Sequence, residues 1–151
     1  MFNINKVNRN IELFIFDIYI AILKIKKVAS EFDNADNLQY DFKSWDSVIR
    51  EFEIIGEASK YLMKASLLSQ NYQVLVDFRN KITHEYFGID NDIVWSIIHI
   101  ELDDIENVIL ELINAIESNL KQELIEAFIK DNSYLDFVVK ELKELRMPNE
   151  K

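Results

Sequence analysis

Apolar residues recur at intervals of three and four along most of this 151-residue chain, a spacing that places them on one face of a helix. The pattern predicts four helices, at about residues 8–32, 45–68, 72–87 and 92–118. Suitable capping residues stand at their ends: Ser44, Asn71, and Asp90 or Asn91 as N-caps, and Gly88 as a C-cap. The intervening segment EFDNADNLQYDF is rich in Asn and Asp and is predicted to be a loop. Four helices with short connections predict an all-α, up-down antiparallel helical bundle.

A further amphipathic stretch follows, from Leu120 to Leu145, with a break expected at DNSY. Its apolar stripe must be buried against other apolar surface. We therefore divide the chain into a bundle, residues 1–118, and a C-terminal helical extension, residues 119–151, that packs on the bundle, on a second subunit or on a partner protein. The chain has only two glycines and one proline, which are too few for the turns of a β-sheet protein and for Gly-rich phosphate-binding loops.

The first predicted helix is apolar on nearly all sides. Its core, IELFIFDIYIAILKI, is interrupted by Glu12, Asp17 and Lys24 and is shorter than the ~20 residues that span a bilayer, so we expect no membrane insertion. Such a helix suits burial on more than one side, by its own bundle or by a second subunit.

Charge and cysteine content limit the functions that the chain can have. A formal net charge of −10 argues against nonspecific binding to nucleic acid or to an anionic membrane, because both depend on many Lys and Arg side chains. Any nucleic-acid site must therefore be local. The absence of cysteine excludes disulfides and thiolate metal sites and is typical of a cytoplasmic protein. Asp103, Asp104 and Glu106 spread around their helix, where we expect a solvated face, and no metal or other cofactor is expected.

The segment FRNKITHEYFG crowds Arg79, Asn80, His84 and Tyr86 into an otherwise apolar stretch. At about 100° per residue, Arg79 and Tyr86 lie within ~20° of one another on a helix, whereas His84 lies ~140° from Arg79. Asn80 lies one turn before His84, where its amide can hold one imidazole nitrogen. For Arg79 and His84 to converge, the helix must bend near Thr83 or a second copy of the chain must complete the site.

Composition alone favours a structural role for these residues, since Arg and His near a helix C-terminus interact with its dipole and Tyr extends its hydroxyl to water. Gly56 costs helix stability, which indicates the close approach of another helix. Glu57 beside it either pairs with Arg79 or is solvated. His99 lies among isoleucines and is more typical of a core or edge histidine than of a catalytic one.

Two segments resemble a known group of proteins. Arg79, Asn80, His84, Glu85 and Tyr86, with four residues between Arg and His, resemble the signature of the HEPN superfamily, and specifically the HepT-like toxins of two-component toxin-antitoxin pairs. WDSVIREFEIIGEASKYL resembles the second helix of that family, and FRNKITHEYFGIDNDIVW its motif helix and following turn. The resemblance covers about residues 11–112, and the segment after residue 118 is longer than expected after the family's last core helix.

The resemblance implies a homodimer in which two motif helices face one another across a cleft, and a metal-independent endoribonuclease acting on RNA. In that reading His84 transfers protons, Arg79 grips the scissile phosphate, Asn80 positions His84, and Tyr86 contacts phosphate or stacks on a base. Glu57, from its place beside Gly56, is a separate candidate for supporting Arg79. The resemblance also implies a small MNT-type nucleotidyltransferase as antitoxin, which silences the toxin by AMPylation of Tyr86 in a type VII-like system.

Two other functions stay open. The chain also fits a non-catalytic helical subunit that binds nucleotide or substrate for a nucleotidyltransferase, a reading that its negative charge and lack of an obvious basic path leave open. It fits as well a dimerisation module with no ligand. Intact Arg79, His84 and Tyr86 favour the ribonuclease.

Overall fold

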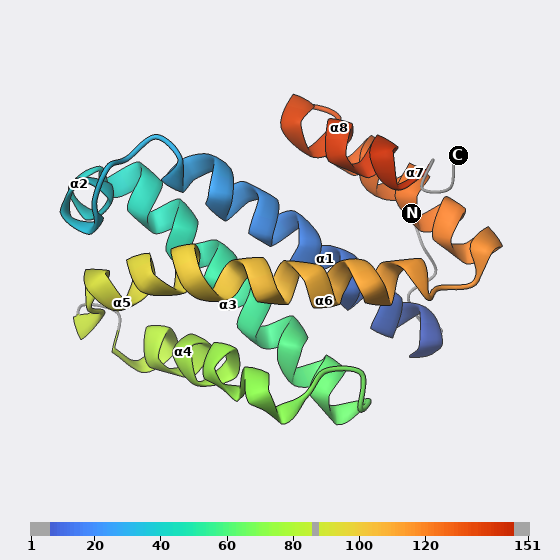
Figure 1. Cartoon of the computed structure of the whole chain (residues 1–151), viewed down its shortest axis with the longest axis horizontal. Helices are drawn as coiled ribbons and strands as arrows, with labels where there is room; N and C mark the ends of the chain where they lie inside the picture. Colours follow the sequence, from blue (N-terminus) through green and yellow to red (C-terminus); the bar gives the residue numbers. More distant parts are fainter. Residues whose placement is uncertain (1–6, 86–87, 147–151) are drawn as a thin grey trace.

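The computed structural model describes residues 7–85 and 88–146, with side chains from residue 11 onward. All regular structure in these ranges is helical, which confirms the predicted all-α bundle (Figure 1). The α-helices are α1 (Val7–Ala29), α2 (Ala35–Tyr40), α3 (Phe42–Lys64), α4 (Gln73–His84), α5 (Asn91–Ser96), α6 (Leu102–Asn114), α7 (Ser118–Asp131) and α8 (Asp136–Leu145). A 3₁₀ turn, Gln70–Tyr72, precedes α4, and a π-helical turn, Ile97–Glu101, joins α5 to α6.

Helix α1 is the centre of the bundle. It packs along α3 and α6 and also contacts α8, and its buried side chains are Ile15, Phe16, Ile18, Tyr19, Ile20, Ala21, Ile22, Ile25 and Ala29. The prediction that this helix is buried on more than one side is confirmed. Because its own chain supplies the cover, the apolar character of α1 gives no argument for a second subunit.

The C-terminal extension contributes to the same hydrophobic core. The expected break is confirmed, since α7 ends at Asp131 and α8 begins at Asp136. Phe128 of α7 stacks on Phe16 of α1 with 5.1 Å between the ring centroids. Other apolar side chains of the extension join the core cluster: Leu124, Ile125, Val138, Leu142 and Leu145. Figure 1 shows α8 and α4 at opposite edges of the molecule, with α1, α3 and α6 between them. The division of the chain at residue 118 stays a prediction.

Two of the predicted N-caps are wrong, and in both cases an earlier side chain takes the role. Asp41 caps α3 by accepting a hydrogen bond from the Ser44 N–H at 3.3 Å. Ser69 caps the turn before α4 by accepting from the Asn71 N–H at 3.0 Å. The predicted capping by Asp90 is confirmed, since its carboxylate accepts from the Asp92 N–H.

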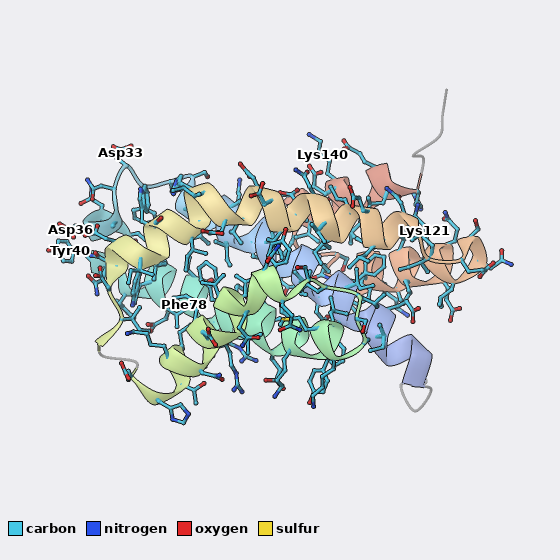
Figure 2. All side chains as sticks on the ribbon, turned by 60° about the horizontal axis from the view of Figure 1, so that its bottom comes forward. Asp33, Asp36, Tyr40, Phe78, Lys121 and Lys140 are labelled. Atoms are coloured by element: carbon cyan, nitrogen blue, oxygen red, sulfur yellow. The ribbon has the colours of Figure 1, made fainter. Side chains whose placement is uncertain are left out.

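The predicted loop between the first two long helices contains the short helix α2. Asn34 caps it by accepting from the Asn37 N–H at 2.8 Å, and Ala35 and Leu38 are buried. Burial of these two apolar residues outweighs the turn preference of the surrounding Asn and Asp residues. Figure 2 shows Asp36 and Tyr40 of α2, with the nearby Asp33, projecting from the same end of the bundle.

The fourth predicted helix is interrupted by the π-helical turn and ends at Asn114 rather than at residue 118, because Glu117 caps α7. Its acidic cluster is only partly solvated. Asp103 and Asp104 are exposed, whereas Glu106 is half-buried. Lys26 of α1 hydrogen-bonds Glu106 at 2.6 Å and also pairs with Asp103. Across the described ranges, no three potential ligands are grouped so that they could hold a metal ion. The helices described also include none with the length and apolarity needed to cross a membrane.

The crossing of α3 and α4 depends on Gly56. Helix α4 packs mainly on α3, and a Cβ atom at Gly56 would lie 2.2 Å from Cβ of Arg79 and 2.8 Å from the carbonyl oxygen of Leu75. Phe78, which Figure 2 labels on α4, packs edge to face on Phe52 of α3, with 5.2 Å between the ring centroids. The predicted close approach of another helix at Gly56 is therefore confirmed, and it places Arg79 directly over α3.

Asp17 is an acidic residue within the apolar run of α1. Burial raises the pKa of its carboxyl group to about 6, and no hydrogen bond or ion pair within the described residues compensates for that burial. Because the pKa is higher in the folded chain than in the unfolded one, the folded state binds the proton more tightly. The charged carboxylate therefore destabilises the fold above about pH 6, and this cost disappears as the pH falls toward the unfolded pKa.

We expect Gly56→Ala to lower the free energy of unfolding by about 1–3 kcal/mol, because the new methyl group forces α4 away from α3 and this outweighs the gain in helix propensity. Chemical denaturation measures the change. Gly88→Ala is the matched control, since nothing lies within 4 Å of a Cβ atom there. Equal stability of the two variants would contradict the close crossing.

We expect Asp17→Asn to stabilise the fold at pH 8 by about 1–2 kcal/mol, with a gain that shrinks through pH 6 and vanishes near pH 4. Asp33→Asn, at an exposed position, should have no such pH-dependent effect. Denaturation curves across this pH range compare the two. A gain for Asp17→Asn that did not change with pH would show that burial of the charge is not its cause.

Candidate functional site

The last turns of α4 carry the polar motif. The chain leaves the helix at Glu85, whose N–H still bonds the Lys81 carbonyl oxygen at 2.7 Å while its backbone turns to a φ of −140°. The predicted C-cap at Gly88 is wrong by three residues, since Glu85 is the C-cap, and Gly88 does not adopt a positive φ. Gly88 instead closes a turn by donating its N–H to the Glu85 carbonyl oxygen at 2.9 Å. His84 is therefore the last residue of its helix.

Arg79 is held over α3 by one ion pair and one hydrogen bond. Its Nη2 lies 3.1 Å from Oε1 of Glu57, and its Nη1 donates to Oδ1 of Asn80 at 3.3 Å. Of the two alternatives left open for Glu57, the structure therefore has the ion pair. The Arg79 side chain remains 33% exposed, so an incoming anion can reach the guanidinium group.

His84 lies in a different environment from Arg79. It is exposed at the C-terminal end of α4, and in the described part of the chain no hydrogen bond joins it to Asn80 or to Arg79. Asn80 turns toward Arg79, so the expected Asn80 to His84 hydrogen bond is absent from this structure. The hydroxyl of Thr83 donates to the carbonyl oxygen of Arg79 at 3.0 Å. One chain thus presents Arg79 and His84 on one helix without bringing them into contact, and Tyr86 lies outside the described residues.

His99 is an edge histidine, as predicted. It is exposed on the π-helical turn, its ring lies 4.2 Å from the Trp95 ring, and its Nδ1 lies 2.9 Å from the Trp95 carbonyl oxygen. None of these contacts connects it to the motif on α4.

A hollow of about 250 Å³ lies beside Arg79, between α1, α3 and α4. Its charged lining comes from all three helices and its apolar lining from α1 and α3; the residues are Phe14, Asp17, Arg50, Glu53, Ile54, Glu57, Ala58 and Arg79. Sequence reasoning missed this hollow. A signal existed in the spacing of Arg50, Glu53, Ile54 and Glu57, which places them on one face of α3, but their position opposite Asp17 required the packed structure.

Comparison with known proteins places the chain beside a family of ribonucleases. Residues 18–112 match the family model described as "Ribonuclease HepT-like". The chain is 31% identical over 130 residues to "Putative RNase MJ0127" of Methanocaldococcus jannaschii, which covers 82% of this chain and 90% of that relative. It is 36% identical over 83 residues to "Probable ribonuclease HepT" of Thermococcus cleftensis, covering 53% of this chain and 74% of the relative.

No solved structure shows significant similarity to the chain. The family match spans α3 and α4 and so includes the crossing at Gly56 and both Arg79 and His84. The fold, the motif and the similarity to ribonucleases lead to one assignment: the chain belongs to the ribonuclease HepT-like family.

Proposed function

We propose that the protein is a metal-independent endoribonuclease toxin that cuts RNA with Arg79 and His84. The observation that carries this proposal is the state of Arg79, whose guanidinium group is held at the helix crossing by Glu57 and Asn80 but stays one-third exposed. An exposed imidazole, His84, ends the same helix. Membership of the ribonuclease HepT-like family supports the same chemistry.

Each residue type suits one part of RNA cleavage. His84 removes the proton of a ribose 2′-hydroxyl or protonates the leaving oxygen, since an imidazole ring can both accept and donate a proton. Arg79 exchanges its contact with Glu57 for the scissile phosphate, whose two oxygens match the planar guanidinium fork. Asn80 keeps Arg79 oriented through its side-chain oxygen.

Two copies of the chain form the working unit in this proposal. Arg79 and His84 project in different directions from α4, so a second α4 across a two-fold axis brings an arginine and a histidine to one phosphate. Helix α4 packs mainly on α3, and side chains on its other faces are exposed: Val74, Asp77, Lys81 and His84.

A nucleotidyltransferase antitoxin of the MNT type is the proposed regulator. It attaches AMP to Tyr86, and the resulting phosphodiester adds a permanent negative charge two residues beyond His84. Arg79 then pairs with this phosphate instead of with RNA, and the attached nucleotide occupies the cleft.

A second candidate function is a non-catalytic nucleotide-binding subunit of such a nucleotidyltransferase. It is favoured by the net charge of −10 and by the three carboxylates in the hollow beside Arg79, which disfavour a long RNA backbone. Nucleotide binding without any RNA cleavage is the result that would favour this candidate.

We expect Arg79→Ala and His84→Ala each to reduce RNA cleavage by at least about 100-fold, because one loses charge stabilisation and the other proton transfer. Cleavage is measured in EDTA with circular dichroism as a check on folding. His99→Ala is the matched control and should cleave at nearly the wild-type rate. Undiminished cleavage by His84→Ala, or a requirement for added Mg²⁺, would refute the proposed chemistry.

We expect a homodimer at micromolar concentration in sedimentation velocity. Val74→Arg should shift it toward monomer, because it places a charge on an exposed side chain of α4 that is 43% accessible in one chain. Ile100→Arg, at a 64% exposed apolar side chain of the π-helical turn, is the control and should remain dimeric. A wild-type protein that sediments only as a monomer would rule out the shared site.

We expect co-expression with a nucleotidyltransferase antitoxin to add the mass of one AMP to each chain and to abolish cleavage. Intact-mass spectrometry detects the adduct, and Tyr86→Phe should show none. An unmodified wild-type chain that is nevertheless inhibited would mean that the antitoxin acts by covering the site.

A further inference from the structure

The hollow beside Arg79 has a charge pattern that suits a neutral ligand better than a second phosphate. Three carboxylates line it, from Asp17, Glu53 and Glu57, against the two guanidinium groups of Arg50 and Arg79. A phosphate placed inside would meet more negative than positive charge. A flat polar group with several N–H donors avoids that repulsion.

Asp17 is the carboxylate of this hollow that, among the described residues, has no ion-pair partner. Glu57 is paired with Arg79, and Glu53 lies 3.7 Å from Arg50, whereas no hydrogen bond or ion pair to Asp17 occurs within the described residues. Burial raises the pKa of Asp17 to about 6, so its carboxylate is largely charged at neutral pH and under-solvated. A ligand that donates hydrogen bonds to it gains more than it would from a solvated carboxylate.

Arg50 supplies the complementary donor. Its side chain is 68% exposed, and the 3.7 Å separation from Glu53 on the same helix is long for a hydrogen bond, so the guanidinium group is free to turn. The apolar lining of the hollow comes from Phe14, Ile54 and Ala58. A planar ring that rests on this lining presents one edge to Asp17 and another to Arg50.

We propose that this hollow binds a guanine base of the RNA, next to the phosphate that Arg79 holds. Among the four bases, guanine alone places two adjacent donors, N1–H and the 2-amino group, on one edge, where a single carboxylate accepts both. It also presents O6 and N7 as a pair of acceptors, which an arginine reads in bidentate fashion. Asp17 therefore selects the base and Arg50 fixes its orientation. The inference rests on the proposed function for the position of the phosphate, and the base subsite itself is tested without cleavage.

Guanosine 5′-monophosphate is the direct probe, with inosine 5′-monophosphate as the matched ligand that lacks only the 2-amino group. We expect the guanine nucleotide to bind at least about ten-fold more tightly and to shift the backbone NMR signals of Ile54 and Ala58. Asp17→Asn should abolish the preference, while Asp33→Asn, an exposed and remote Asp, should keep it. Because Asp17→Asn relieves a buried charge, loss of folding is not expected to complicate the comparison.

The outcomes separate this inference from the proposed function. A preference for guanine that depends on Asp17 supports the subsite, even in a protein that cuts no RNA. Equal binding of both nucleotides, no binding at millimolar concentration, or an undiminished preference in Asp17→Asn would overturn the subsite while leaving the Arg79 and His84 chemistry intact. Cleavage of short RNAs that differ in one base beside the cut then reports whether the preference carries through to catalysis.

Discussion

The close crossing of α3 and α4 at Gly56 is the constraint on which the proposed site depends. With no side chain at Gly56, the Cβ atom of Arg79 comes within a distance that any other residue would block. That approach places the guanidinium group against Glu57, and the ion pair at 3.1 Å gives it a fixed starting position. A partly exposed arginine held in this way loses less side-chain freedom when it binds a phosphate than one on an open surface. The contact between Gly56 and Arg79 therefore supports both the stability of the fold and the proposed function.

The crossing also explains why the residues of α4 lie in different environments. Phe78 and other apolar residues anchor its inner face, Arg79 sits at the edge of that face, and His84 ends the helix in solvent. The hollow between α1, α3 and α4 opens beside Arg79 because the polar face of α3 lies opposite Asp17 there. The arginine proposed to bind phosphate, the histidine proposed to transfer protons and the hollow are thus arranged around one short helix.

Much of the fold could be predicted from the sequence, because apolar periodicity is strong in α1, α3 and α6. The pattern shows how much of a helix must be buried but not what covers it, so the apolar α1 was compatible with a second subunit until α3, α6 and α8 were seen to surround it. Short elements were harder. Helix α2 has six residues, too few for a periodic signal. The capping residues Asp41 and Ser69 lie close to Ser44 and Asn71, whose side chains are also suitable N-caps.

The site was only partly predictable for a related reason. Arg79, Asn80 and His84 are recognisable because they occur together in a short segment, and Gly56 marks the helix that approaches. The direction of Asn80, which bonds Arg79 and not His84, depends on the packed position of the guanidinium group. Asp17 and Arg50 line the same hollow but come from different helices. No local sequence pattern shows how these two helices are rotated relative to each other.

The ends of the cut RNA test the central claim most directly, namely that Arg79 and His84 promote attack by the ribose 2′-hydroxyl on the adjacent phosphate. End-group analysis by mass spectrometry of a short RNA cleaved in EDTA distinguishes the mechanisms. The account predicts a 2′,3′-cyclic phosphate on the upstream fragment and a 5′-hydroxyl on the downstream fragment, because the attacking oxygen belongs to the substrate. A 5′-phosphate with a free 3′-hydroxyl would mean that water attacks instead, and would contradict it.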